Sequence, residues 1–179
     1  VHYLAIESGD WVLEDGGAGI RMLAGTAEDV SNIESAAYDG TGGTTITFSP
    51  AFSAAPEAIL TISSANNSKW TGTAVSANNN EANEITANSM DVSMGISRDT
   101  DTVRDPEDID YVVFDTTTGT NNGVLFDALR GTGIAVSGTD VNYNQTFSSA
   151  PGVTLVHNNG TNGADGAFAQ KDTGAPSTN

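Results

Sequence analysis

The most concentrated chemistry in the chain is a run of carboxylates. Six of the twelve residues from Asp99 to Asp110 are acidic: Asp99, Asp101, Asp105, Glu107, Asp108 and Asp110. Calcium takes about six to eight oxygen ligands, and the alternation in Asp99-Thr100-Asp101 is one that cation-binding loops use. The sequence therefore offers a calcium site, with these ligands: Asp99, Asp101, Asp105, Glu107 and Asp108.

A solvated acidic loop is the alternative for this segment. The EF-hand pattern is absent, because no glycine stands at its turn and no glutamate at its twelfth position. Arg98, just before the run, and Arg104, within it, neutralise part of its charge. A smaller acidic pair, Glu14-Asp15, precedes Gly16-Gly17 and is typical of a turn.

Trp70 is the candidate for binding a sugar. It lies in the polar segment Asn67–Gly72, where an indole ring could stack on a pyranose. The alternative is a ring that caps the edge of the hydrophobic core. Trp11, which follows Gly9-Asp10, is open to the same two interpretations.

The sequence contains no recognisable set of catalytic residues. The chain has two histidines, His2 and His157, and no G-x-S-x-G motif in which a serine could be activated. The glycine-rich Gly16–Gly19 lacks the lysine of a phosphate-binding loop. With 23 acidic residues, no pair of carboxylates is singled out for glycoside hydrolysis. We expect a protein that is not an enzyme, with no cofactor or with calcium.

Composition limits the partners. The 179 residues carry 23 acidic and 6 basic side chains, a net charge of −17, and no cysteine. Six cations cannot form the basic face that nucleic acid requires. No apolar run reaches the ~18 residues of a membrane span. The Thr/Asn/Gly-rich, cysteine-free composition is typical of a secreted protein, and the acidic surface suits a salty or calcium-rich setting.

Short strands separated by Gly and Asn turns must position these groups. Strands are expected at 1–7, 11–13, 20–24, 44–48, 58–63, 71–76, 89–96, 109–115, 124–128, 134–136, 141–143, 153–156 and 166–170. The best helical window, Gly25–Glu34, is short and is more typical of a loop. This pattern predicts an all-β fold with antiparallel β-sandwiches, of the jelly-roll kind.

An internal repeat is the most informative feature of the chain. Thr45–Pro56 aligns without a gap with Asp140–Pro151, at an offset of 95. Two upstream pairs recur in the same order: Tyr3–Glu7 with Tyr111–Asp115, and Leu23–Thr26 with Leu129–Thr132. Such an ordered recurrence predicts a duplicated unit of about 100 residues.

The repeat predicts the domain organisation. Residues 40–137 are expected to form one complete β-sandwich unit, and residues 1–39 and 138–179 to be complementary halves of a second unit. The halves would pair within the chain or between neighbouring subunits, or belong to a longer array. Pairing between subunits would extend a filament by strand addition.

The middle segment resembles the H-type lectin domain, a small six-stranded antiparallel sandwich. The matching elements are Phe48, Phe52 and Pro56, followed by Ile59–Ile62, Met90–Met94 and Ile109–Val113. Tyr111 stands where that family usually has tryptophan. The family's sugar-binding residues have no recognisable counterpart here, so the resemblance implies a sandwich fold and does not imply sugar binding.

These observations favour a non-enzymatic extracellular structural or surface protein whose β-units assemble head-to-tail with copies of the same chain, with calcium as a possible stabiliser. One alternative is a carbohydrate-binding adhesin module that recognises cell-surface glycans. Another is a viral spike or capsid-associated protein.

Overall fold

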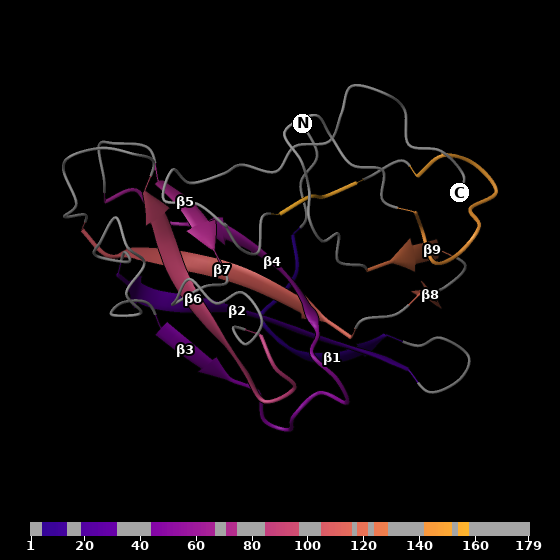
Figure 1. Ribbon diagram of the computed structural model, residues 1–179, viewed down its shortest axis with the longest axis horizontal. Helices are drawn as coiled ribbons and strands as arrows, with labels where there is room; N and C mark the ends of the chain where they lie inside the picture. Colours follow the sequence, from indigo (N-terminus) through magenta and orange to yellow (C-terminus); the bar gives the residue numbers. More distant parts are fainter. Residues whose placement is uncertain are drawn as a thin grey trace.

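The computed structural model of the chain is built from β-strands, with no helix in the part that it describes (Figure 1). The described residues are 5–13, 19–31, 44–66, 71–74, 85–96, 105–115, 118–121, 124–128, 142–151 and 154–157. All strand pairs in these ranges are antiparallel. The all-β, antiparallel fold class expected from the sequence is confirmed.

The larger sheet has four strands in the order β1-β2-β7-β4. Its strands are β1 (Gly9–Leu13), β2 (Ile20–Val30), β7 (Glu107–Phe114) and β4 (Glu57–Ile62). Along β2 the side chains of Ile20, Met22 and Ala24 are buried, and the residues between them are half-exposed. This period of two is the pattern of a strand with one face against a core.

Strand β2 contains an irregularity near its end. Its register with β7 shifts between Ala27 and Val30, and Asp29 has a φ of 51°, in the left-handed region. The extra residue of this β-bulge allows Val30 to return to the core, where it has no exposed surface. The loop or helical turn expected within Gly25–Glu34 is therefore wrong as far as Val30, because cross-strand pairing with β7 overrides the weak local signal.

The smaller sheet has three strands in the order β3-β6-β5. Its strands are β3 (Thr44–Thr47), β6 (Ser89–Ile96) and β5 (Thr71–Ala74). Figure 1 shows β6 running across β2 and β7, and β2 contacts both β6 and β3. Strand β4 of the larger sheet also contacts β5.

Both sheets supply the hydrophobic core. Met90, Val92 and Met94 occupy alternate positions of β6, and none has exposed surface. They pack with buried side chains of β2, β4, β7 and the connecting segments: Ala27, Val30, Phe48, Phe52, Ala58, Leu60, Ile85, Ile109 and Val113. Burying a side chain of this size stabilises the fold by about 1.5–3 kcal/mol.

A separate hairpin follows β7. It consists of β8 (Thr118–Asn121) and β9 (Val124–Asp127). Gly119 of β8 lies so close to Ile20 of β2 that a Cβ on the glycine would be 2.0 Å from the Ile20 Cδ1. The expected strands at 141–143 and 153–156 do not form in their described parts, 142–143 and 154–156. The expected strands at 134–136 and 166–170 lie outside the described residues.

Candidate functional site

Strand β7 carries the described part of the acidic cluster. Asp105 is exposed just before the strand, Glu107 begins it, and Asp108 and Asp110 follow. Asp99 and Asp101 lie outside the described residues. The same is true of Trp70 and of the pair Glu14-Asp15.

Glu107 is a buried carboxylate, with 2% of its surface exposed. Its Oε2 accepts a short hydrogen bond from the Ser64 hydroxyl and a second one, of 3.0 Å, from the main-chain N–H of Asn66. The Ser64 oxygen in turn accepts the main-chain N–H of Asp108 at 2.7 Å. A buried polar group is tolerated when such hydrogen bonds replace those to water, so these contacts anchor the segment after β4 to the start of β7.

The next two acids of β7 bind β2. Asp108 Oδ1 accepts the main-chain N–H of Asp29 at 3.1 Å, which satisfies a donor left unpaired by the bulge. Asp110 Oδ1 accepts the Thr26 hydroxyl at 2.7 Å. Glu107 and Asp108 are adjacent on a strand, so their side chains leave opposite faces.

This arrangement bears on the calcium prediction. Within the ranges that the structure describes, no group of three or more His, Asp or Glu side chains is placed to hold a metal ion. The described acids instead make hydrogen bonds within the protein. With Asp99 and Asp101 outside these ranges, the calcium site stays a prediction, and so does sugar stacking by Trp70.

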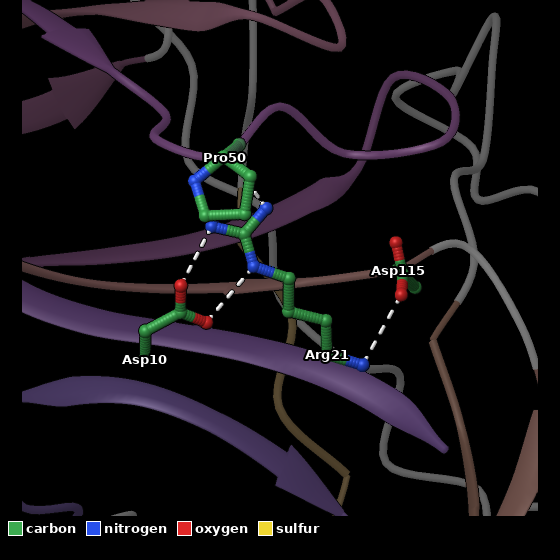
Figure 2. Close-up of polar contacts among 4 residues, drawn as sticks. All are labelled: Asp10, Arg21, Pro50 and Asp115. Carbon is green, nitrogen blue, oxygen red and sulfur yellow. Dashed lines mark hydrogen bonds and ion pairs between the residues drawn. The ribbon is translucent and has the colours of Figure 1, made fainter. Parts of the chain in front are cut away.

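A polar contact that the sequence did not reveal is centred on Arg21 of β2 (Figure 2). Its Nε and Nη2 donate to the two carboxylate oxygens of Asp10 on β1, each at 2.8 Å. Its Nη1 donates to the main-chain oxygen of Pro50 at 2.6 Å. The guanidinium carbon also lies 4.2 Å from the centre of the Phe52 ring. The single side chain thus joins the edge strand β1 to the segment after β3.

The electrostatics follow from this geometry. The hydrogen bonds from Arg21 lower the pKa of the Asp10 carboxyl, and those bonds in turn raise the pKa of Arg21. The main chain of Arg21 also exchanges two hydrogen bonds of 3.1 Å with Asp115, through its N–H to the Asp115 carboxylate and its oxygen to the Asp115 N–H. Arg21 is one of only six lysine and arginine residues in the chain. Among 23 acidic residues, this scarcity is the feature of the sequence that could have drawn attention to Arg21.

The two aligned segments of the repeat each hold a pair of aromatic rings. Phe48 and Phe52 lie edge-to-face, with ring centres 4.9 Å apart and an angle of 88° between planes. Tyr143 and Phe147, at the offset of 95, have centres 5.1 Å apart and an angle of 76°. The second pair therefore has the same local geometry as the first.

The two hairpins also correspond in register. In the first, Val12 pairs with Arg21 and Leu13 with Ile20. In the second, Thr118 pairs with Asp127 and Gly119 with Phe126. Each residue of the second set is 106 positions after its counterpart, which is the offset of Leu23–Thr26 from Leu129–Thr132. A slip of one residue in either hairpin would destroy this agreement.

Arg21 and Asp127, which correspond at the offset of 106, each contact one of the two aligned segments. The Arg21 guanidinium donates to the main-chain oxygen of Pro50, as described above. Its counterpart Asp127 accepts the Asn144 main-chain N–H at 2.5 Å and the Asn144 amide at 3.3 Å. Asn144 aligns with Ser49, the neighbour of Pro50. The two contacts involve neighbouring positions of the aligned segments, with Arg21 as a donor and Asp127 as an acceptor.

Exposed apolar side chains gather on the hairpin strands. Trp11 and Val12 on β1, and Val124 and Leu125 on β9, are among the large hydrophobic residues with substantial exposure. Val124 is 67% exposed and Leu125 38%. Adjacent residues of a strand face opposite sides, so both faces of β9 present apolar surface.

The structure describes one of the two histidines. His157 is half-buried in a segment without secondary structure, and His2 lies outside the described residues. Among the described residues there is no helix that could span a membrane. Comparison of the chain with protein-family models, curated proteins and solved structures found no match.

Proposed function

We propose that this chain is a non-enzymatic extracellular structural or surface protein whose β-units assemble head-to-tail. The observation that carries the proposal is the correspondence of the hairpins β1–β2 and β8–β9 in register, at the offset of 106 that also relates Leu23–Thr26 to Leu129–Thr132. Two copies of one building block in a chain are the signature of proteins that extend by repetition.

The proposal includes a two-layer sandwich as the unit. Its support is that the four-stranded and three-stranded sheets share one cluster of buried side chains. The pairing favours a unit of about residues 9–115 over the expected unit of 40–137, because β2 is hydrogen-bonded to β7 along most of its length. The hairpin β8–β9 would then begin the second unit.

The experiment measures the mass of the full chain by light scattering over a range of concentrations, with negative-stain microscopy and with and without millimolar calcium. The proposal expects a ladder of oligomers or filaments. Dependence of that ladder on calcium would support an ion at the acidic cluster. A monomer at every concentration would contradict the assembly function.

The alternative function is a carbohydrate-binding module. One observation favours it: Trp11 on the edge strand β1 is 40% exposed, and a ring that stacks on sugars must be accessible. Trp11→Ala and Trp70→Ala variants, tested on a glycan array beside the unaltered chain, distinguish the two functions. Glycan binding by the unaltered chain that is lost in either variant would support the carbohydrate-binding function, and no glycan binding by the unaltered chain would contradict it.

A further inference from the structure

Strand β1 is an open edge of the four-stranded sheet. It pairs with β2 on one side, and in the described part of the chain no strand pairs with it on the other. Trp11 is 40% exposed and Val12 66%, so this edge is both apolar and accessible. Exposed main-chain groups beside apolar side chains form a template for a further strand.

The register of the sheet shows which main-chain groups face outward. The N–H and C=O of Arg21 point away from β1, because both bond to Asp115 at the end of β7. Val12 is the register partner of Arg21, so its own N–H and C=O point away from β2. Those of Asp10, two residues earlier, also point outward, and those of Trp11 point toward β2.

The usual protection of a sheet edge is missing from β1. Native edge strands carry charges, prolines or bulges that oppose the addition of another strand. The residues of β1, Gly9–Leu13, include no proline, and their pairing with β2 has no register shift. The one charged side chain of the strand, Asp10, is bound by two hydrogen bonds from Arg21 (Figure 2). The charge that could repel a second strand is therefore neutralised within the protein.

We propose that β1 of one copy pairs with β1 of a second copy, antiparallel about a two-fold axis, with Trp11 opposite the partner's Trp11. Outward-facing residues must pair with outward-facing ones, so Asp10 lies opposite the partner's Val12, and Gly9 lies opposite the partner's Leu13. Every residue of the strand is then paired, and Asp10 and Val12 exchange main-chain hydrogen bonds across the axis. The two four-stranded sheets become one continuous sheet.

The charges of the strand favour this register over its neighbours. A shift by two residues in one direction places Asp10 opposite the partner's Glu14, and a shift in the other direction places it opposite the partner's Asp10. Like charges that lie directly opposite each other on neighbouring strands are destabilising. In the proposed register, Asp10 lies opposite an uncharged valine.

The Trp11 ring is already oriented for this contact. Its Nε1 donates to the Glu7 oxygen at 3.1 Å, and the ring lies over Gly9, where a Cβ would be 3.0 Å from Nε1. The partner's Leu13 lies opposite Gly9, so it would pack against the ring. The two opposed tryptophans would add an aromatic pair on the same face of the sheet.

This contact goes beyond the proposed head-to-tail assembly, because a two-fold contact closes at two copies. Between two head-to-tail arrays it would join the arrays side by side. Each contact uses a single short strand and is smaller than a standard protein interface, so one contact alone is weak. Many such contacts along two arrays would act together.

Cysteine cross-linking of the full chain tests the contact, since the chain has no cysteine of its own. Trp11→Cys places two thiols in a directly opposed pair, where the Cα atoms lie about 4.5 Å apart and a disulfide fits. Val12→Cys is the matched control, because its two copies lie diagonally, about 7–8 Å apart, which is too far for a disulfide. Both variants are oxidised at about 0.1–1 mM chain, since the contact is weak. Circular dichroism checks that each is folded.

Two charged variants measure the same contact at equilibrium. Val12→Glu places a carboxylate opposite the partner's Asp10, whereas Val12→Lys places an ammonium group there. The lysine variant should dimerise at least about fivefold more tightly than the glutamate variant in sedimentation equilibrium. Val124→Glu and Val124→Lys are the controls, because Val124 is 67% exposed on β9 and lies outside the contact. The same change of charge at that position should have a smaller effect.

Trp11→Cys should form a covalent dimer about tenfold faster than Val12→Cys, or more. Equal rates of cross-linking, no cross-link in either variant, or equal dimerisation of Val12→Glu and Val12→Lys would overturn the two-fold contact. A ladder of oligomers from the unaltered chain, without the Trp11→Cys cross-link, would overturn this contact and leave the head-to-tail assembly standing. The cross-link in a chain that forms no species larger than a dimer would support the contact and contradict the head-to-tail assembly.

Discussion

The Tyr111 side chain lies over Gly25 on the neighbouring strand. A Cβ at position 25 would be 2.5 Å from the Tyr111 hydroxyl oxygen and 2.8 Å from its Cζ. The two residues are register partners in β7 and β2. Any side chain at position 25 would have to displace the Tyr111 ring from the place it occupies.

Replacing Gly25 by alanine should therefore destabilise the protein by about 1–3 kcal/mol, the cost of overpacking. Urea denaturation measures the free energy of unfolding. The double variant Gly25→Ala/Tyr111→Val is the control, because the smaller side chain frees the space for the new methyl group. If its loss equals the sum of the two single losses, the contact is not the cause.

Burial raises the pKa of the Tyr111 phenol above its usual value of 10.0. The folded state thus holds the proton more tightly than the unfolded state. The contribution of this phenol to the free energy of unfolding is fully present below about pH 10, and it is lost as pH rises through the pKa of the folded state. Tyr111→Phe should flatten the fall in melting temperature above pH 10. An equally steep fall in this variant would assign the effect to other groups.

The Arg21 contact should respond to acid through its partner. Arg21 lowers the pKa of Asp10, so the stability from this pair is present above the unfolded pKa of about 3.8 and is lost as pH falls through the folded pKa. The Asp10 side chain is 37% exposed, which limits the effect to under about 1 kcal/mol. Asp10→Asn should be less stable at pH 7 and equal to the unaltered chain at low pH, by thermal melting.

Truncating the arginine should cost more than removing its carboxylate partner. Arg21→Ala loses the bond to Pro50 and the packing on Phe52 as well as the ion pair, a loss of about 2–3 kcal/mol. Arg21→Met keeps most of the aliphatic stem and should recover part of that loss. Equal stability of Arg21→Ala and Asp10→Asn would show that only the ion pair matters.

Two substitutions of Asp29, at the bulge in β2, should differ in their effect on the stability of the protein. Asp29→Gly should be neutral or slightly stabilising, because glycine adopts a φ of 51° without strain. Asp29→Val should lose about 1–2 kcal/mol, because a β-branched residue is disfavoured there. Asp108→Ala should also lose about 1 kcal/mol, since the Asp29 N–H would lose its acceptor. The denaturant midpoints of the three variants, compared with that of the unaltered chain, measure these changes in stability.

Much of the strand content could be predicted from the alternation of apolar and polar residues along the sequence. Segments such as Thr44–Phe48 and Ser89–Ile96 were expected as strands and form β3 and β6. Strand β8 was missed because Thr118–Asn121 is weakly apolar, although Asn122-Gly123 beside it is a strong hairpin signal. The strand character of Ala27–Val30 depends on a bulge and on distant β7, which local patterns cannot reveal.

The candidate sites were harder to predict. The sequence showed that the acids near Glu107 are concentrated, but it could not show that Ser64 and Asn66, over forty residues away, donate to that carboxylate. The Arg21 contact likewise depends on the pairing of β1 with β2 and on the path of the chain at Pro50. Long-range contacts of this kind follow from topology.

The burial of the methionines has a consequence for oxidation. The chain has three methionines and no cysteine, and Met22, Met90 and Met94 are all buried, the last two completely. All of its sulfur is thus shielded from peroxide while the protein is folded. Sulfoxide formation requires the sheets to open, and the polar product would then oppose their closing. The rate of methionine oxidation therefore reports how often the core is exposed.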